Sequence, residues 1–332
     1  KRNRITLSKI AEICGVSRQV VSMVAAGKKH HSIRYSDETR DRILKVIKDT
    51  GYRPNRTVSG FFNHEHGALG LLVRSVYHIQ PGVSKGLIVA AKARNQMITI
   101  EYLDGNGMPK MVVEDCVDGI ILYETVDPEI IKSIHRYKLP VVQVNSNERF
   151  GPGCVTFDEE GSCEMAAKRF HERGCRRPLM VGMTSMWGEP DHFSMDLRME
   201  AFSRAWEELG GMSPERLDMI PSYHPQADAG PLMAFLQANP ETDCILAMNC
   251  GVVPHLYDAI RQVGLRIPDD IAVLTWTHNE ITVSMRPQTT CFSQQLDVVG
   301  DCTINLLNDL IEGKEVPDRL VLPYGLTERE SC

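Results

Sequence analysis

The side chains spaced for chemistry lie near the N-terminus, and that chemistry is hydrogen-bond recognition rather than catalysis. Arg18, Gln19 and Ser22 carry a guanidinium, an amide and a hydroxyl within five residues. On a helix, residues three and four apart share a face. A guanidinium can fork onto guanine O6 and N7, and an amide onto adenine N6 and N7. The spacing therefore predicts a helix whose exposed face contacts base edges of double-stranded DNA.

Capping and turn residues around these side chains predict the helices that position them. Thr6 can cap a first helix and Ser17 a second, with Gly15 in the tight turn between them. A third helix is predicted from the cap Ser36 to Gly51. Apolar side chains follow helical spacing in all three segments: Leu7, Ile10, Ala11, Cys14, Val16, Val20, Val21, Val24, Ile43, Val46 and Ile47. The pattern favours a helix-turn-helix domain, with a generic helical bundle as the alternative.

Charge is divided unevenly along the chain. Residues 1–60 hold 14 Lys/Arg against 5 Asp/Glu, a formal charge of +9. The remaining residues hold 23 against 38, or −15, which together give the net −6 of the whole chain. A basic N-terminal segment can neutralise phosphates, whereas an acidic body discourages non-specific binding to nucleic acid.

Composition excludes several other classes of protein. The 332 residues are 42% hydrophobic and 24% charged, as in a globular protein too long for one small domain. No run of about 18 apolar residues and no secretory signal is present, which predicts a cytoplasmic protein without membrane contact. The ten cysteines form no C-x-x-C pair, so reduced buried thiols are expected, without a metal site or a cofactor.

Beyond residue 67, short apolar runs alternate with helical patterns. Strands are predicted at 68–73, 97–103, 119–123, 141–145, 154–157, 179–182, 217–220, 244–249 and 271–276. Helices are predicted at 82–95, 127–137, 159–173, 192–209, 225–238 and 251–263. Repeated β-α-β units imply parallel sheets. The sequence thus predicts an α/β core of two doubly wound lobes, whose strand ends form a crevice for a small molecule.

Several motifs in this order resemble the lactose-repressor family of bacterial transcription regulators over essentially the whole chain. They are Ile5-Thr6-Leu7, Gly15-Val16-Ser17, Val20-Val21-Ser22, Gly-Tyr-Arg-Pro-Asn at 51–55, and the segments 117–122, 174–178, 198–202, 264–273 and 329–332. The resemblance implies a periplasmic-binding-protein-like core, a small effector in the crevice, and repression or activation of nearby genes. It also implies a homodimer or tetramer that binds a pseudo-palindromic operator. A dimer is favoured because no heptad segment follows Cys332.

The resemblance divides the chain into three parts. Residues 1–54 correspond to the DNA-binding domain, 55–66 to a hinge, and 67–332 to the effector-binding and dimerisation core. Within the core, lobe one is expected to comprise 67–158 and 291–316, and lobe two 159–288 and 317–332.

The family's base-contacting pair falls on Arg18 and Gln19, while Thr6, Ser17, Tyr52 and Asn55 match its phosphate-contacting positions. Lys28 and Lys29 are natural additional phosphate contacts. Phe61 stands where relatives insert a leucine into the minor groove. The competing interpretation is that Phe61 and Phe62 pack against the core, because Gly60 and Val58-Ser59 weaken a hinge helix here.

Arg198 matches the family's most telling effector-binding residue, with Ser194 four residues earlier on the same helix face. Other matched or neighbouring pocket positions are His78, Asn145, Phe157, Tyr223, Asn249, Trp276 and His278, each with core packing or capping as its alternative role. Cys250 and Thr277 stand where sugar-binding relatives carry acids. An excess of positive charge beside Arg198 is therefore expected, and with it a small anionic or strongly polar sugar-derived effector, such as a sugar acid or a sugar phosphate.

Two other functions remain possible from the residues. A regulator of this fold could act without a small-molecule effector, since the two acids are missing. An enzyme with an accessory basic domain is the other, but the chain has no nucleophile elbow, P-loop or zinc-hydrolase motif. The sequence therefore predicts that the protein is not an enzyme.

Overall fold

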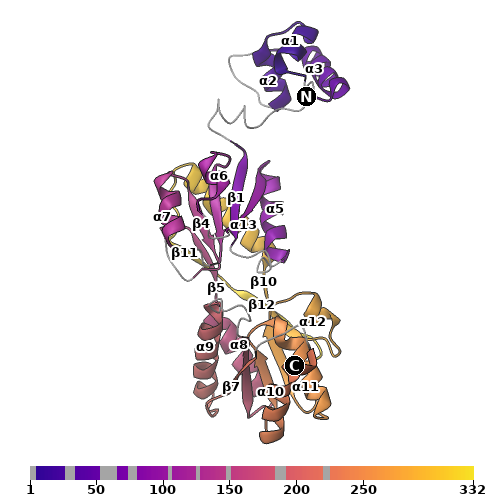
Figure 1. The fold of residues 1–332 in the computed structure, drawn as a ribbon, viewed down its shortest axis with the longest axis vertical. Coiled ribbons are helices and arrows are strands. Elements are labelled where there is room, and N and C mark those ends of the chain that lie inside the picture. Colours follow the sequence, from indigo (N-terminus) through magenta and orange to yellow (C-terminus); the bar gives the residue numbers. More distant parts are fainter. Residues whose placement is uncertain are drawn as a thin grey trace. The chain divides into compact units, whose positions relative to one another are not determined.

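The computed structural model describes residues 5–26, 34–52, 66–73, 81–103, 107–124, 128–146, 151–183, 192–219 and 225–332 (Figure 1). The chain divides into two compact units. The first comprises Lys1–Ala68 and Met111–Asp118, and the second Leu69–Lys110 and Gly119–Cys332.

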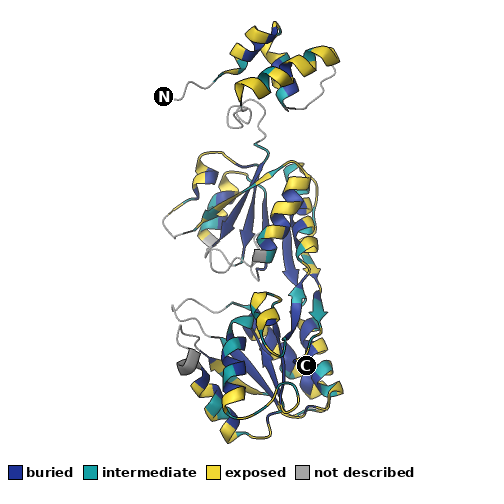
Figure 2. Cartoon of the chain, turned by 90° about the vertical axis from the view of Figure 1, so that its right-hand side faces the viewer, coloured by how far each residue is buried: buried dark blue, intermediate teal, exposed yellow. Residues whose placement is uncertain are grey.

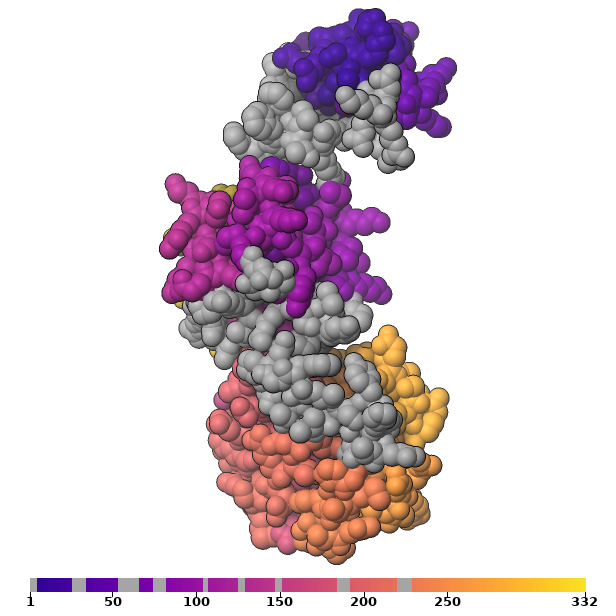
Figure 3. Space-filling view, viewed as in Figure 1, coloured from indigo at the N-terminus to yellow at the C-terminus, as the bar shows by residue number. Residues whose placement is uncertain are grey.

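The N-terminal unit contains three helices around one small core. They are α1 (Leu7–Cys14), α2 (Arg18–Ala26) and α3 (Asp37–Thr50). Thr6 accepts the Lys9 backbone N–H at 3.3 Å and Ser36 that of Thr39 at 3.1 Å, while Gly15 and Gly51 end α1 and α3 with φ of 63°. The buried core is Ile10, Ala11, Cys14, Val21, Val24 and Ile43. The predicted caps, turn and apolar stripe are confirmed, and Figure 3 shows this unit as a rounded cluster of indigo side chains.

The first sheet of the second unit has the order β11-β5-β4-β3-β1-β2. Its strands are β1 (Ala68–Val73), β2 (Met97–Tyr102), β3 (Gly119–Tyr123), β4 (Val141–Val144), β5 (Cys154–Phe157) and β11 (Arg319–Leu322). Its helices are α5 (Pro81–Ala93), α7 (Pro128–Arg136) and α13 (Leu296–Ile311), while α6 (Lys110–Val113) lies where the chain passes from the second unit to the first. The pairs β1·β3, β3·β4, β4·β5 and β5·β11 are parallel, as predicted for β-α-β repetition.

Helices α5 and α13 cross at two glycines. A Cβ at Gly300 would overlap the carbonyl carbon and oxygen of Gly86, and a Cβ at Gly86 would overlap the backbone oxygen of Leu296. The two helix backbones are therefore in direct contact, which only a residue without a side chain allows.

The second sheet repeats this plan with the order β12-β10-β9-β8-β6-β7. Its strands are β6 (Pro178–Met183), β7 (Glu215–Met219), β8 (Cys244–Ala247), β9 (Ala272–Trp276), β10 (Thr290–Gln294) and β12 (Tyr324–Thr327). The helical elements are α8 (Glu159–Glu172), α9 (Ser194–Glu208), α10 (Pro225–Ala238), η1 (Cys250–Val252), α11 (Val253–Gln262) and α12 (Glu280–Ser284). Among the described strands of this sheet, β12 is antiparallel to β10, whereas the pairs β10·β9, β9·β8, β8·β6 and β6·β7 are parallel.

Alternate residues of the second sheet pack against different helices. Met180, Leu246 and Leu274 share a core with α8 and α9 side chains, whereas Val181, Ile245 and Val273 share one with α10 and α11. Side chains on a strand point alternately to the two faces, so both faces of this sheet are covered. Figure 2 shows the inner strands of both sheets as buried. Because these strands are buried on both faces, their sequences are continuous apolar runs.

The predicted lobe boundaries need correction. β10 lies beside β9 in the second sheet, although 291–316 had been expected in lobe one. β11 lies beside β5 in the first sheet, although 317–332 had been expected in lobe two. A short apolar strand carries no local signal for the sheet it joins, because either sheet buries it equally well. The chain therefore crosses between the sheets three times: after β5, between β10 and α13, and between β11 and β12.

All ten cysteines are free, and seven of them are buried, as the sequence predicted. Among the described helices, none has both the length and the apolar character needed to cross a bilayer.

Candidate functional site

The first candidate surface is the exposed side of α2. Arg18, Gln19 and Ser22 are exposed, while Val21 and Val24 on the opposite side are buried. Ser17 accepts the Val20 backbone N–H at 3.4 Å and so helps to fix the first turn of the helix. The sequence placed these three polar side chains on one exposed face, and the structure does the same.

Tyr52 adjoins this surface. Its ring packs against the three-helix core, and burial raises the pKa of its phenol, while the positive charge of Arg18 acts in the opposite direction. The electrostatic effect of Arg18 means that the two side chains are near each other. Arg18, a predicted base contact, and Tyr52, a predicted phosphate contact, thus lie in the same part of the N-terminal unit.

Several predicted site residues lie outside the described residues. They are Lys28, Lys29, Asn55, Phe61, His78 and Tyr223. Of the predicted hinge at 55–66, only His66 is described; its backbone N–H donates to the Asp118 carboxylate at 2.6 Å.

The second group of candidate residues collects at the carboxyl ends of strands. Asn145 follows β4, Phe157 ends β5, Asn249 lies two residues after β8, and Trp276 ends β9. In open parallel sheets, ligands bind outside this edge. The predicted effector residues therefore occupy the edge at which a ligand is expected.

Arg198 forms the centre of a buried cluster in the second lobe. Its Nε donates to Glu159 Oε2 at 2.7 Å, and its Nη1 donates to the Met248 carbonyl at 2.8 Å. Its Nη2 donates to Glu159 Oε1 at 3.3 Å and to the Tyr324 hydroxyl at 3.0 Å. Four of its five N–H groups are thus used by protein acceptors.

Aromatic rings surround this ion pair. The Arg198 guanidinium carbon lies 4.6 Å from the centre of the Trp276 ring, within the range of a cation–π interaction. Trp276 packs on Phe292 at 4.9 Å between ring centres. Phe157, from the first sheet, packs on Tyr324 at 5.3 Å. The buried charge pair is therefore packed among aromatic rings that are themselves buried.

The buried Arg198 guanidinium keeps its charge because of its carboxylate partner. Burial alone would lower the pKa of Arg198, but the Glu159 carboxylate raises it above the usual value. Burial also raises the pKa of Tyr324 well above its usual value, so the phenol stays protonated and donates to Glu159 Oε1 at 2.8 Å. The expected excess of positive charge at Arg198 is therefore wrong, because Glu159 balances it.

A hydrogen-bonded chain links the first sheet to the start of α9. Asn145 Nδ2 lies 3.2 Å from His192 Nε2, and His192 Nδ1 lies 2.7 Å from the Ser194 hydroxyl. Asn145 and Ser194 are both buried. The structure thus brings together two predicted residues that are 49 positions apart in the sequence, through a histidine that was not predicted.

Two predicted residues have local structural roles. The Asn249 side chain accepts the Gly251 backbone N–H at 2.7 Å and caps η1. His278 is exposed, and its Nδ1 lies 2.7 Å from Arg329 Nη2. The structure does not place His278 among the partners of Arg198.

Sequence reasoning missed Glu159, Tyr324 and His192. Glu159 could have been found, since it follows a predicted strand by two residues and so had to lie at the carboxyl edge. Tyr324 lies in a segment for which no strand was predicted, and His192 has no distinguishing local pattern.

The family model described as periplasmic binding protein-like domain matches residues 167–332, half of the chain. The chain is similar to the HTH-type transcriptional regulator CelR of Thermobifida fusca, with 24% identity covering 100% of this chain and 99% of that protein.

Two solved structures share the fold. The lac repressor dimer bound to operator and the anti-inducer ONPF superposes with a TM-score of 0.78 at 18% identity, covering 99% of each chain. The complex of the transcriptional regulator CelR with cellobiose has a TM-score of 0.66 at 23% identity, covering 99% of this chain and 100% of that one.

Proposed function

Because the chain belongs to the lactose-repressor family of transcription regulators, we propose that it is a repressor that binds a pseudo-palindromic DNA operator as a homodimer. A small polar, sugar-derived effector in the second unit controls that binding. The observation that carries the proposal is the exposed row of Arg18, Gln19 and Ser22 on α2, in a segment of formal charge +9.

The DNA-binding role follows from the helix-turn-helix arrangement of α1 and α2. A second helix held by a tight glycine turn can enter the major groove with its first turn against the bases. Arg18 and Gln19 stand in that first turn, and both are exposed. Thr6, Ser17 and Tyr52 contact the backbone phosphates and hold the register.

Replacement of Arg18 by alanine tests this role. Discrimination at one base pair should fall by about 1–3 kcal/mol, while binding to random DNA weakens much less, because only a base contact is lost. Affinities for an operator selected from genomic fragments are measured by fluorescence anisotropy at fixed salt. Repression of a reporter promoter that carries the selected site should fall in parallel.

Arg42→Ala on α3 is the matched control, since it removes the same charge from an exposed position of another helix. It should weaken operator and random DNA about equally. Equal losses on both DNAs for Arg18→Ala would contradict the base-contacting role.

The homodimer has support at the edge of the first sheet. β2 is the last strand of that sheet, and it leaves Met97, Ile100 and Tyr102 about half exposed. Ile88 and Val89 of α5 are exposed to a similar extent. Apolar side chains gathered at one edge are typical of a protein–protein interface. A monomer at micromolar concentration in sedimentation equilibrium would contradict this part of the proposal.

The effector is proposed to be rich in hydroxyl groups rather than strongly anionic. The Arg198–Glu159 pair offers donors and acceptors together without a net charge. Among the described residues, the buried Nε1 of Trp276 has no hydrogen-bond partner, so its N–H can donate to a ligand hydroxyl. Glu159 thereby replaces the acids that are missing after Asn249 and Trp276.

A thermal-shift panel of neutral sugars, sugar acids and sugar phosphates distinguishes a neutral, hydroxyl-rich effector from an anionic one. A neutral sugar or glycoside at 100 times its Kd should stabilise the protein by about 2.7 kcal/mol through mass action. Ser194→Ala should weaken this binding, whereas Ser203→Ala, which removes a hydroxyl bonded to the Met199 carbonyl on the same helix, should not. Stabilisation by sugar acids or phosphates alone would contradict a hydroxyl-rich effector.

A regulator without an effector is the second candidate. The observation in its favour is that protein groups already satisfy four of the five Arg198 N–H groups. In that case no member of the panel changes either the melting temperature or the affinity for the operator.

A further inference from the structure

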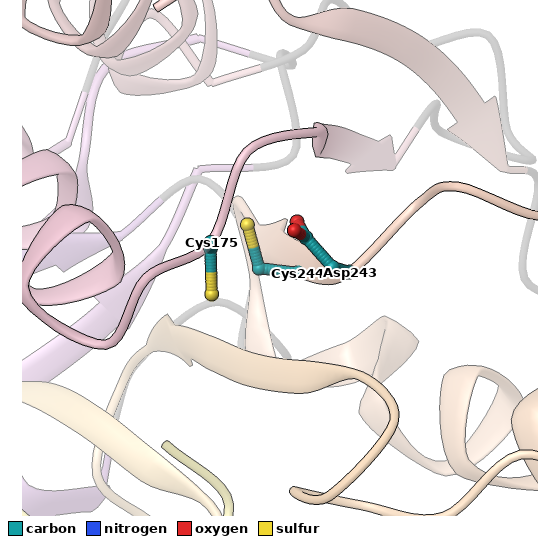
Figure 4. Close-up of side chains that lie close together, drawn as sticks. All are labelled: Cys175, Asp243 and Cys244. Carbon is teal, nitrogen blue, oxygen red and sulfur yellow. The ribbon is translucent and has the colours of Figure 1, made fainter.

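Three metal-ligating side chains meet at one end of the second sheet, in the part of the chain that the structure describes. They are Cys175, Asp243 and Cys244. We propose that this cluster binds a divalent cation of the zinc class. Figure 4 shows Asp243 and Cys244 side by side at the start of β8, with Cys175 beside them on the segment that leads into β6.

The spacing of the ligand atoms suits a tetrahedral site. The two sulfurs and a carboxylate oxygen all lie within 4.8 Å of one another. With zinc–sulfur bonds of about 2.3 Å, ligand atoms around a tetrahedral ion are about 3.8 Å apart. Binding of one ion therefore requires the ligand atoms to close in by up to about 1 Å. In Figure 4 the Cys175 and Cys244 sulfurs point to opposite sides, so Cys175 also has to turn towards the other two side chains.

The fold holds the two cysteines together although they are 69 positions apart in the sequence. β6 and β8 are neighbouring parallel strands, and Pro178 at the start of β6 is in register with Cys244 at the start of β8. Cys175 precedes Pro178 by only three residues. Its position relative to Cys244 is therefore set by strand pairing, which a search for C-x-x-C spacing does not detect.

Backbone groups orient the carboxylate. Asp243 Oδ2 accepts the Arg176 N–H at 2.6 Å, and Oδ1 accepts the Arg177 N–H at 2.9 Å. Each oxygen retains a second lone pair. Ligating carboxylates are commonly hydrogen-bonded in this way, which fixes their direction and limits the entropy lost on binding. The Arg177 guanidinium lies 3.6 Å from the Glu241 carboxylate, which offsets its charge near the site.

The donor set and its burial select the class of ion. Cys244 is 0% exposed and Cys175 is 6% exposed. Two sulfurs and one carboxylate oxygen favour zinc-class ions over magnesium or calcium, which prefer all-oxygen sites. The three protein ligands leave a fourth position for water. Bound metal would join the segment before β6 to the start of β8 and stabilise the second lobe.

Cobalt(II) is the spectroscopic probe for this site. The full-length protein, reduced with a phosphine that has no thiol, is titrated with Co²⁺. We expect a near-ultraviolet thiolate-to-cobalt band that saturates at one equivalent per chain and is displaced by Zn²⁺. Zn²⁺ alone should also raise the melting temperature. Cys175→Ser should abolish both effects; Cys244→Ser should do the same, and circular dichroism checks that each variant is folded.

Two cysteine variants serve as controls. Cys154→Ser removes a buried thiol in the first sheet, and Cys116→Ser removes an exposed one. Both should retain the cobalt band and the thermal shift. A wild-type protein without the band overturns the proposal. So does a band that survives in Cys175→Ser, or one that disappears in Cys116→Ser, which would mark adventitious binding at an exposed thiol.

Discussion

Glu159→Ala is expected to lower the free energy of unfolding of the core by about 3–5 kcal/mol, because it leaves the Arg198 guanidinium buried without its counter-charge. Both side chains are buried, and the pair is 2.7 Å apart. The Met248 carbonyl and the Tyr324 hydroxyl remain as acceptors but supply no negative charge. Urea unfolding followed by circular dichroism measures the loss.

The adjacent residue provides the control. Glu160 pairs with Arg204 at 3.3 Å, and both of these side chains are exposed. Glu160→Ala should therefore cost no more than about 1 kcal/mol. The double variant Glu159→Leu with Arg198→Met removes both charges and should recover most of the lost stability, since a packed apolar pair needs no counter-charge. A loss in Glu159→Ala no larger than that in Glu160→Ala would contradict the buried pair.

Gly300→Ala is expected to destabilise the first lobe by about 3 kcal/mol, at the upper end of the cost of overpacking. The added Cβ would overlap the carbonyl of Gly86, and backbone atoms cannot move aside as a flexible side chain can. Helices α5 and α13 would have to separate along their whole contact. Gly86→Ala should act similarly, because its Cβ would meet the backbone oxygen of Leu296.

Gly230→Ala in α10 is the matched control. Apart from its chain neighbours and its own helix backbone, no atom lies within 4 Å of a Cβ built at Gly230, and the residue is exposed. This substitution should change stability by no more than about 1 kcal/mol, because the lower backbone entropy cost of alanine in a helix is opposed by crowding of its Cβ against Pro231. A change as small as this in Gly300→Ala, measured by the same urea unfolding, would show that the two helices are not in backbone contact.

The N-terminal helices and most strands could be predicted from the sequence because their signals are local. Thr6, Gly15, Ser36 and Gly51 mark helix ends within a few residues of the atoms they satisfy. Strands buried on both faces appear as short, continuous apolar runs. The sheet to which β10 and β11 belong could not be predicted from local sequence, because it depends on pairing with β9 and β5.

The candidate site divides in the same way. Arg198 and Ser194 could be placed on one helix face from spacing alone, and the expected exposure of Arg18 and Gln19 is confirmed. The partner of Arg198 could not be predicted, because Glu159 is on another helix 39 positions earlier. Which residues of different helices pair depends on tertiary packing. Here the pairing of Arg198 with Glu159 removes the excess positive charge that the sequence predicted.

The three crossings between the sheets give the core a redundancy that a single linker lacks. Cleavage of the chain at any one crossing separates it into two pieces, but the two remaining crossings still join a folded part of one lobe to a folded part of the other. Neither lobe corresponds to one continuous stretch of the sequence, because β10 and β12 complete one sheet while α13 and β11 complete the other. Any rotation of one lobe against the other must be shared by all three crossings, which restricts the hinge to a narrow set of axes.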